Sequence, residues 1–293
     1  MLLAIDVGNT NIVVGLFRGE RLEGNWRLAT DAARTADEYA VLLEGLLGHT
    51  GNTFDQVSGV SISSVVPTLT ATFRELGERY LDLPALVVSA KIETGVKIVI
   101  DNPLEMGADR IVNALAALRM HRVPAIVIDF GTATTFDAVS ERGELLGSAI
   151  APGLLTAMEG LYHRAARLFS VELVAPRAAI GRDTGGALQS GAIFGYAGLV
   201  EGLVARFRRE LGGDPRVIAT GGLAPVVVGA TDVVDVTDPY LTLHGLRLIH
   251  ELNNGPTVTR GRRDGAARRQ RDVRPVAQPA LEQRESPPRP ASG

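Results

Sequence analysis

The chain has 293 residues, of which 45% are hydrophobic and 22% charged, as expected for a soluble protein with one large domain or two moderate ones. It contains no cysteine, which excludes disulfides, thiolate metal sites and cysteine nucleophiles, and its five histidines show no metal-ligand spacing. No apolar run reaches the ~20 residues that span a bilayer, and the N-terminus lacks the basic segment of a signal peptide. We therefore expect a cytoplasmic protein without membrane contact.

The net charge of −3 is unevenly distributed. Residues 260–293 hold nine Arg against four Asp or Glu, a charge of +5, so the other 259 residues carry −8. A basic tail suits nucleic acid, but the acidic body argues against nucleic acid as the main ligand. Hydrophobic periodicity ends near Asn254, and we expect residues 255–293 to form a disordered basic tail because they bury too little apolar surface.

Strand and helix patterns alternate along the rest of the chain. In the first half they predict strands over residues 2–7, 11–17 and 21–30, a helix over 37–47, a strand over 57–66, a helix over 67–81 and a strand over 86–89. In the second half they predict a helix over 107–121, strands over 125–129, 134–139 and 144–150, helices over 153–168 and 185–211, strands over 217–220 and 233–236, and a helix over 241–252.

The β-β-β-α-β-α order thus occurs twice, and each round opens with an apolar strand that ends in Asp-x-Gly with a threonine close behind. Asp6 and Gly8 form the first such turn, and Asp129 and Gly131 form the second about 120 residues later. This duplication predicts an α/β protein with two similar lobes of the actin/hexokinase/Hsp70-like (ribonuclease H-like) fold, residues 1–121 and 122–254, and a nucleotide cleft between them.

The two turns have the chemistry of a phosphate site. Glycine lets the backbone approach a ligand closely, the N–H groups of such a turn can point at phosphate oxygens, and an Asp at a strand end suits Mg²⁺, directly or through water. A glycine pair after the strand at 217–220 fits the place where this superfamily holds adenosine. The residues predicted to bind ATP are Asp6, Val7, Gly8, Asn9, Thr10, Asn11, Ile12, Val13, Gly131, Thr132, Gly221 and Gly222.

Five segments together resemble one family, the type III pantothenate kinases, in order and spacing over roughly residues 1–255. They are Asp6-Val7-Gly8-Asn9-Thr10-Asn11, Asn102-Pro103 with Gly107-Ala108-Asp109-Arg110, Asp129-Phe130-Gly131-Thr132-Ala133-Thr134-Thr135, Ala151-Pro152-Gly153 and Gly181-Arg182-Asp183-Thr184. The resemblance implies the transfer of phosphate from ATP to pantothenate, the first step of coenzyme A synthesis, by a homodimer that uses Mg²⁺ and a monovalent cation, K⁺ or NH₄⁺.

The resemblance also implies roles for single residues. Gly107, Ala108, Asp109 and Arg110 would bind pantothenate, with Asp109 as the catalytic base, and Asp129 would bind the monovalent cation. Thr184 would contact substrate from the neighbouring subunit. The chemistry of the residues agrees, because Asp109 opens an apolar-periodic helix whose N-terminus favours a carboxylate, and the fork of Arg110 suits an anionic substrate.

One position departs from the family pattern, since Ile100 stands where an aromatic residue is common. Two other interpretations stay open at this point. One is a kinase of another small alcohol, such as a sugar, on the same fold. The other is a regulatory or transcription accessory protein on the same scaffold, which the presence of Asp6, Asp109 and Asp129 disfavours.

Overall fold

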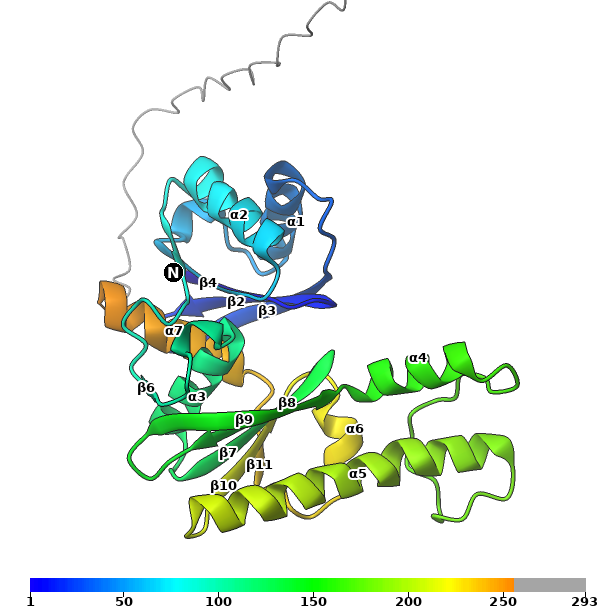
Figure 1. Cartoon of the computed structure of the whole chain (residues 1–293). Coiled ribbons are helices and arrows are strands. Elements are labelled where there is room, and N and C mark those ends of the chain that lie inside the picture. The colour runs from blue at the N-terminus through cyan, green and yellow to red at the C-terminus, as the bar shows by residue number, and fades with distance from the viewer. Residues whose placement is uncertain (256–293) are drawn as a thin grey trace, which may run out of the picture. The chain divides into compact units, whose positions relative to one another are not determined.

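Two β-sheets organise residues 1–255, the part of the chain that the computed structural model describes (Figure 1). The strands are β1 (Leu2–Val7), β2 (Asn11–Arg18), β3 (Arg21–Ala29), β4 (Gly59–Ser64), β5 (Ala85–Val87), β6 (Lys97–Ile98), β7 (Ala125–Phe130), β8 (Ala133–Val139), β9 (Glu144–Pro152), β10 (Arg216–Thr220) and β11 (Val236–Thr237). The α-helices are α1 (Ala36–His49), α2 (Pro67–Leu76), α3 (Ala108–Met120), α4 (Leu154–Arg164), α5 (Thr184–Leu211), α6 (Ala224–Val228) and α7 (Leu241–Asn254).

The two sheets have the same topology. The first runs β3-β2-β1-β4-β5, and the second runs β9-β8-β7-β10-β11 with the short strand β6 added beside β9. In each sheet the opening strand is antiparallel to the strand of its own hairpin and parallel to the strand that follows a helix. This duplication confirms the predicted fold of the actin/hexokinase/Hsp70-like type.

Helices cover both faces of each sheet, so the described residues form five layers (Figure 1). Helices α1 and α2 pack on the outer face of the first sheet, and α4, α5 and α6 pack on the outer face of the second. Helices α3 and α7 lie between the two sheets and share one hydrophobic core with the inner faces of both. The faces that contact α3 and α7 are therefore the inner faces of the two sheets.

Side-chain alternation along β1 and β7 places their acids on these inner faces. In β1 the residues Leu3, Ile5 and Val7 point to the outer core, so Asp6 points inward. In β7 the outward residues are Ile126, Ile128 and Phe130, so Asp129 also points inward. The two strands thus deliver one carboxylate each to equivalent places in the two sheets.

Some predicted elements end elsewhere. The helix expected over residues 153–168 ends at Arg164, because the apolar residues that follow pack on the core as an irregular segment instead of continuing the helix. The strand expected over 233–236 pairs only at Val236–Thr237, since Asp235 accepts the Val217 N–H through its side chain at 2.7 Å. Neither β6 nor α6 was predicted from the sequence.

The predicted division into lobes at residues 121 and 122 stays a prediction. Two elements tie the halves together across that division, because β6 joins the second sheet and α7 packs on β1 and β4 of the first. The tail predicted over 255–293 lies outside the described residues, apart from Gly255.

Helix α5 qualifies as a membrane span by length and composition alone, with a mean hydropathy of 1.2 over an 18-residue window. It differs in this respect from the expectation that no segment would qualify. However, 44% of that window is buried in the protein, and its buried residues, among them Leu188, Ile193 and Val200, pack on the outer face of the second sheet. A core helix of this length has the same composition, which makes the match weak evidence for a span.

Candidate active site

The two Asp-x-Gly turns meet in space. The hydroxyls of Thr10 and Thr132 lie 2.8 Å apart and share a hydrogen bond, although 122 positions separate them in the chain. Each turn is closed by a main-chain bond, from the Gly8 N–H to the Asn11 carbonyl and from the Gly131 N–H to the Ala133 carbonyl, both at 3.0 Å. The predicted phosphate turns of the two halves therefore form one locus.

Several glycines around this locus lie so close to neighbouring atoms that a side chain would collide with them. Gly221 has a φ of +90°, and a Cβ there would lie 2.5 Å from Oδ1 of Asp129. A Cβ on Gly153 would lie 2.3 Å from the Gly131 carbonyl oxygen, which explains why glycine stands directly after β9. A Cβ on Gly222 would lie 3.1 Å from Nη1 of Arg27, a residue that the sequence analysis did not select.

Three carboxylates converge beside the turns. Burial, together with the charges of Asp109 and Asp129, raises the pKa of Asp6 to about 8. Burial raises the pKa of Asp129 to about 7, with Asp109 again adding to the effect. Burial also raises the pKa of Asp109. Since β1, α3 and β7 each contribute one of these acids, the fold assembles the cluster from distant parts of the sequence.

Local structure fixes Asp109 at the first turn of α3. The N-cap is Gly107, and a Cβ there would lie 2.4 Å from Oδ1 of Asp109, so a larger residue would displace this carboxylate. The same oxygen accepts the Arg110 N–H at 2.9 Å. A carboxylate in the first helical turn interacts favourably with the helix N-terminus. The geometry leaves a partly buried acid with a raised pKa, the type of group that accepts a proton near neutral pH.

Asp129 is anchored from behind by a buried hydrogen-bond chain. Asn113, which has no exposed surface, donates to Oδ2 of Asp129 at 3.2 Å. Thr242 of α7 donates to the side-chain oxygen of Asn113 at 2.8 Å. Because Oδ2 is occupied in this way, Oδ1 is left beside the Gly221 turn.

An unpredicted acid, Asp137 of β8, pairs with Arg110. Nε of Arg110 donates to Oδ1 of Asp137 at 2.8 Å, and Nη2 lies 2.7 Å from the same oxygen. The Asp137 side chain has no exposed surface. Burial raises its pKa to about 6, although the Arg110 guanidinium opposes the effect. A single Asp within the apolar strand that follows the second turn carries no local signal, so only the fold reveals it.

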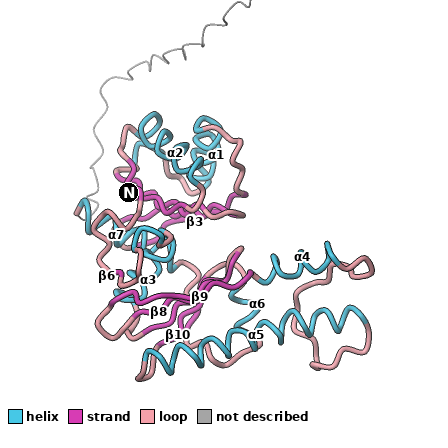
Figure 2. Tube along the Cα trace, viewed as in Figure 1, coloured by secondary structure: helices cyan, strands magenta, loops and turns pink. Residues whose placement is uncertain are grey.

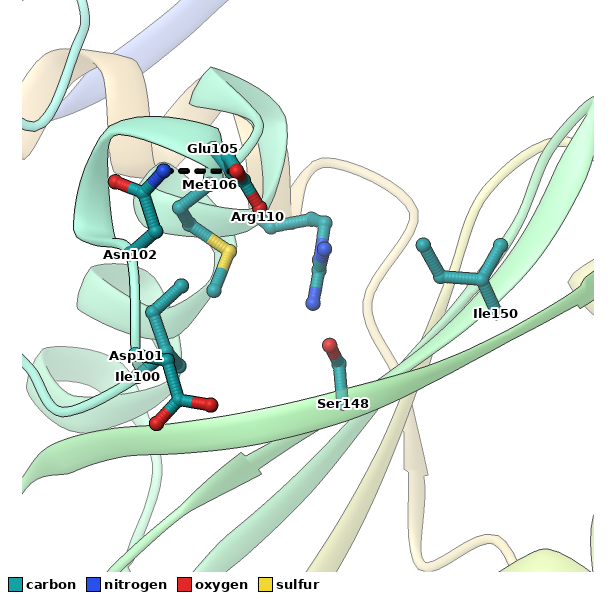
Figure 3. Close-up of a pocket in the computed structure, with 8 residues that line it drawn as sticks. All are labelled: Ile100, Asp101, Asn102, Glu105, Met106, Arg110, Ser148 and Ile150. Carbon is teal, nitrogen blue, oxygen red and sulfur yellow. Dashed lines mark hydrogen bonds between the residues drawn. The ribbon is translucent and has the colours of Figure 1, made fainter.

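A pocket of about 360 Å³ opens beside Arg110 (Figure 3). Side chains from the segment before α3 form one wall, and two residues of β9 form the other. The lining residues are Ile100, Asp101, Asn102, Glu105, Met106, Arg110, Ser148 and Ile150. Asn102 donates to Glu105 at 2.7 Å and so braces the rim. Ile100, the position that departs from the family pattern, thus lines the same pocket as Arg110.

Some predicted site residues do not reach this locus through their side chains. Val7 and Ile12 are fully buried against the outer core of the first sheet, so they offer only main-chain atoms. Thr184 begins α5, and that end of the helix lies beside α4, far from α3 (Figures 1 and 2). Within one chain, the structure does not bring Thr184 together with Arg110.

The acid cluster fits bound cations on electrostatic grounds. No ion pair among residues 1–255 involves Asp6, Asp109 or Asp129, and each has a raised pKa. Partly buried carboxylates that repel one another are stabilised by a positive charge, and hard cations prefer oxygen ligands. Within residues 1–255 no three acidic or histidine side chains stand close enough to hold a metal alone, so phosphate or main-chain oxygens would have to complete the shell.

Known proteins resemble this chain closely in sequence. A family model described as type III pantothenate kinase matches residues 2–206. A type III pantothenate kinase of Streptomyces avermitilis is 54% identical over 261 residues, covering 86% of this chain and 98% of the relative. One of Moorella thermoacetica is 49% identical over 253 residues, covering 86% of this chain and all of the relative.

Among solved structures, a Baf family transcriptional activator from Campylobacter jejuni superposes with a TM-score of 0.55 at 20% identity. The match covers 86% of this chain and 98% of the other. At this identity the likeness supports the fold and no more.

Proposed function

We propose a reaction mechanism and residue roles for this chain, which belongs to the type III pantothenate kinase family. Its members transfer phosphate from ATP to pantothenate in coenzyme A biosynthesis, and this chain is such an ATP-dependent kinase. One observation carries the residue assignment: Asp109 lies close enough to Asp6 and Asp129 for its charge to raise their pKa values, beside the place where the two turns meet. The pKa of Asp109 is itself raised.

Asp109 is the proposed proton acceptor. The substrate hydroxyl loses its proton to the Asp109 carboxylate as its oxygen bonds to the γ-phosphorus of ATP, and the bond from that phosphorus to the ADP oxygen breaks. Phosphoryl transfer depends mainly on positioning and charge neutralisation, so a well-placed carboxylate suffices as base. The raised pKa of Asp109 supports the role, because it makes the carboxylate a better base near neutral pH.

The two turns are the proposed grip on the ATP phosphates. The main-chain N–H groups around Gly8 and Gly131 and the hydroxyls of Thr10 and Thr132 supply donors from both halves. ATP must part the hydroxyls of Thr10 and Thr132 to bind between the turns. The Gly221–Gly222 turn lies beside Asp129 and is the proposed adenosine site.

Two cations complete the proposal. Mg²⁺ would be held by the ATP phosphates and by Asp6, through water, and a monovalent cation, K⁺ or NH₄⁺, by Asp129. When bound, they would neutralise phosphate charge. Gly107, Ala108, Asp109 and Arg110 would bind pantothenate, with the pocket of Figure 3 taking the part of the substrate that carries its carboxylate.

The position of Thr184 supports a proposed homodimer. The family resemblance implies that Thr184 contacts the substrate. Because α5 begins at Thr184 and that end of the helix lies far from α3 (Figures 1 and 2), a second copy would supply this contact. Exposed apolar side chains on α4 and on the segment before α5 support a contact surface there: Leu155 is 47% exposed, Phe169 55% and Ile180 85%. We also propose a cytoplasmic location, where ATP and pantothenate are both available.

An ADP-release assay with a panel of acceptors tests the proposal. Pantothenate should support ADP formation, a sugar and acetate should not, and the rate with pantothenate should rise when K⁺ or NH₄⁺ replaces Na⁺. Equal rates with a sugar would favour a kinase of another alcohol. A rate that is indifferent to the cation would remove the proposed role of Asp129 and leave the rest intact.

A further inference from the structure

We propose that Asp137 is a positioning residue of the substrate site: it holds the Arg110 guanidinium so that the outer edge of that group faces the carboxylate of pantothenate. The inference rests on the proposed function for the role of Arg110. Asp137 itself would not touch the substrate, since its side chain has no exposed surface.

The contact between the two side chains is one-sided. A single oxygen of Asp137, Oδ1, receives the Nε–H of Arg110 at 2.8 Å and also lies 2.7 Å from Nη2. Both contacts use the inner edge of the guanidinium, the edge between Nε and Nη2. An arginine held by this edge cannot rotate about its last bonds, so the direction of its remaining donors is fixed.

The outer edge is left without partners. Among the described residues Arg110 donates hydrogen bonds only through its main-chain N–H and Nε, so Nη1 has no acceptor there. Nη2 is buried and lies 2.7 Å from Oδ1 of Asp137, but it is out of line for a hydrogen bond. A guanidinium carries five N–H donors, and Asp137 accepts one of them. Buried donors without acceptors are costly and therefore uncommon. A carboxylate that entered the pocket would accept a hydrogen bond from Nη1 and pair with the charge of the guanidinium.

The other residues that line the pocket make the orientation of Arg110 important for an anionic substrate. Arg110 is the one cationic side chain among the lining residues, whereas Asp101 and Glu105 line the same pocket and repel an anion. An anionic substrate therefore depends on a single guanidinium that must point the right way. Ser148, directly opposite Asp137 in the β8–β9 register, lies on the same face of the sheet and also lines the pocket.

The experiment compares Asp137→Asn with the wild type in steady state. The KM for pantothenate should rise about 10-fold or more, as expected for a weakened charge-assisted contact, while the KM for ATP and kcat stay within about 3-fold. With the analogue in which a primary alcohol replaces the carboxylate of pantothenate, wild type and variant should have similar kcat/KM values. Equal losses with both acceptors, or an unchanged KM for pantothenate, would overturn the proposal.

Two further variants keep the proposal testable if Asp137→Asn does not fold. Asp137→Glu keeps the charge but moves it by one methylene, so the KM for pantothenate should rise here too; if Asp137→Asn does not fold, an unchanged KM in this variant overturns the proposal. Arg110→Lys should raise the same KM, and adding Asp137→Asn to it should cost little more. Additive losses would mean that the two residues act independently.

These outcomes separate the inference from the function on which it rests. If the wild type does not phosphorylate pantothenate, the proposed function fails before any variant is compared. If the wild type is active and the Asp137 variants keep a normal KM for pantothenate, only the positioning role fails.

Discussion

Ionised Asp6, the proposed Mg²⁺-phosphate residue, should destabilise the folded protein, and Asp6→Asn tests this expectation. The pKa of this carboxyl is raised from 3.8 to about 8, first by burial and then by Asp109 and Asp129. In the absence of ligand the folded state therefore resists ionising Asp6. The amide of Asn has nearly the same shape and no charge, so the variant should be more stable than the wild type at pH 8 and should lose activity with MgATP.

The magnitude follows from the shift. A pKa shift of about four units, at ~1.36 kcal/mol for each unit, limits the gain in the free energy of unfolding to roughly 6 kcal/mol. Because the three acids share the repulsion and their side chains can move apart, we expect Asp6→Asn to raise the free energy of unfolding by about 2 kcal/mol. For a folded part of this size, that corresponds to a rise in Tm of about 4–8 °C.

The pH dependence has a definite sign. The folded-state pKa lies above the unfolded value, so the unfolded state releases its proton first and stability falls as pH rises from about 4 to 8. The Tm advantage of Asp6→Asn should therefore be largest near pH 8 and should shrink toward pH 5.

Differential scanning fluorimetry across this pH range, with and without MgATP, measures both effects. The exposed Asp232→Asn, which removes the same charge at the surface, serves as the control and should leave Tm nearly unchanged. MgATP should stabilise the wild type more than Asp6→Asn. The reasoning is refuted if Asp6→Asn is destabilising at pH 8 without ligand, or if its Tm advantage grows as pH falls.

Asp109→Asn should lower kcat by about 100-fold or more without lowering Tm, because a proton acceptor is lost; a folded variant with normal kcat in the coupled assay would contradict this. Gly221→Ala should lower both Tm and activity because φ is +90° and the site is crowded, whereas Gly45→Ala, exposed on α1 with nothing within 4 Å, should be neutral or slightly stabilising. Equal effects in thermal melts would be inconsistent with that difference. Mixing Asp109→Asn chains with Thr184→Ala chains should restore up to about a quarter of wild-type activity, since half of the randomly paired dimers would hold one intact site. Demonstrated subunit exchange without recovery, or an active monomer in light scattering, would exclude a shared site. Removing residues 260–293 should leave kcat and Tm nearly unchanged, and a large loss of either would show that the tail contributes.

The sequence was most informative where short-range pattern and chemistry coincide. Asp6 and Asp129 were predicted because each ends an apolar strand and precedes a glycine turn, and the structure brings both to the inner faces of the sheets. The repetition of this pattern was also enough to predict the duplicated fold, because equal element order in two halves implies equal topology. Asp109 was selected through the family resemblance, and its place at the start of an amphipathic helix agrees with that selection.

Long-range pairings left no comparable signal. Asp137 is a lone acid in an apolar strand, and its role depends on Arg110, 27 positions earlier, packing against it. Asn113 and Thr242 form a buried chain across 129 positions, and nothing local to either residue indicates the other. Such polar contacts inside a core are set by how helices and sheets dock, which single-sequence periodicity does not encode.

The most direct test of the central claim is to identify the phosphorylated product. Wild-type protein, MgATP and pantothenate in K⁺ buffer should yield ADP and 4′-phosphopantothenate in equal amounts, as quantified by mass spectrometry, and Asp109→Asn should form both at least about 100-fold more slowly. ADP release that does not depend on pantothenate, or the absence of phosphopantothenate from a folded protein that phosphorylates another alcohol, would contradict the account.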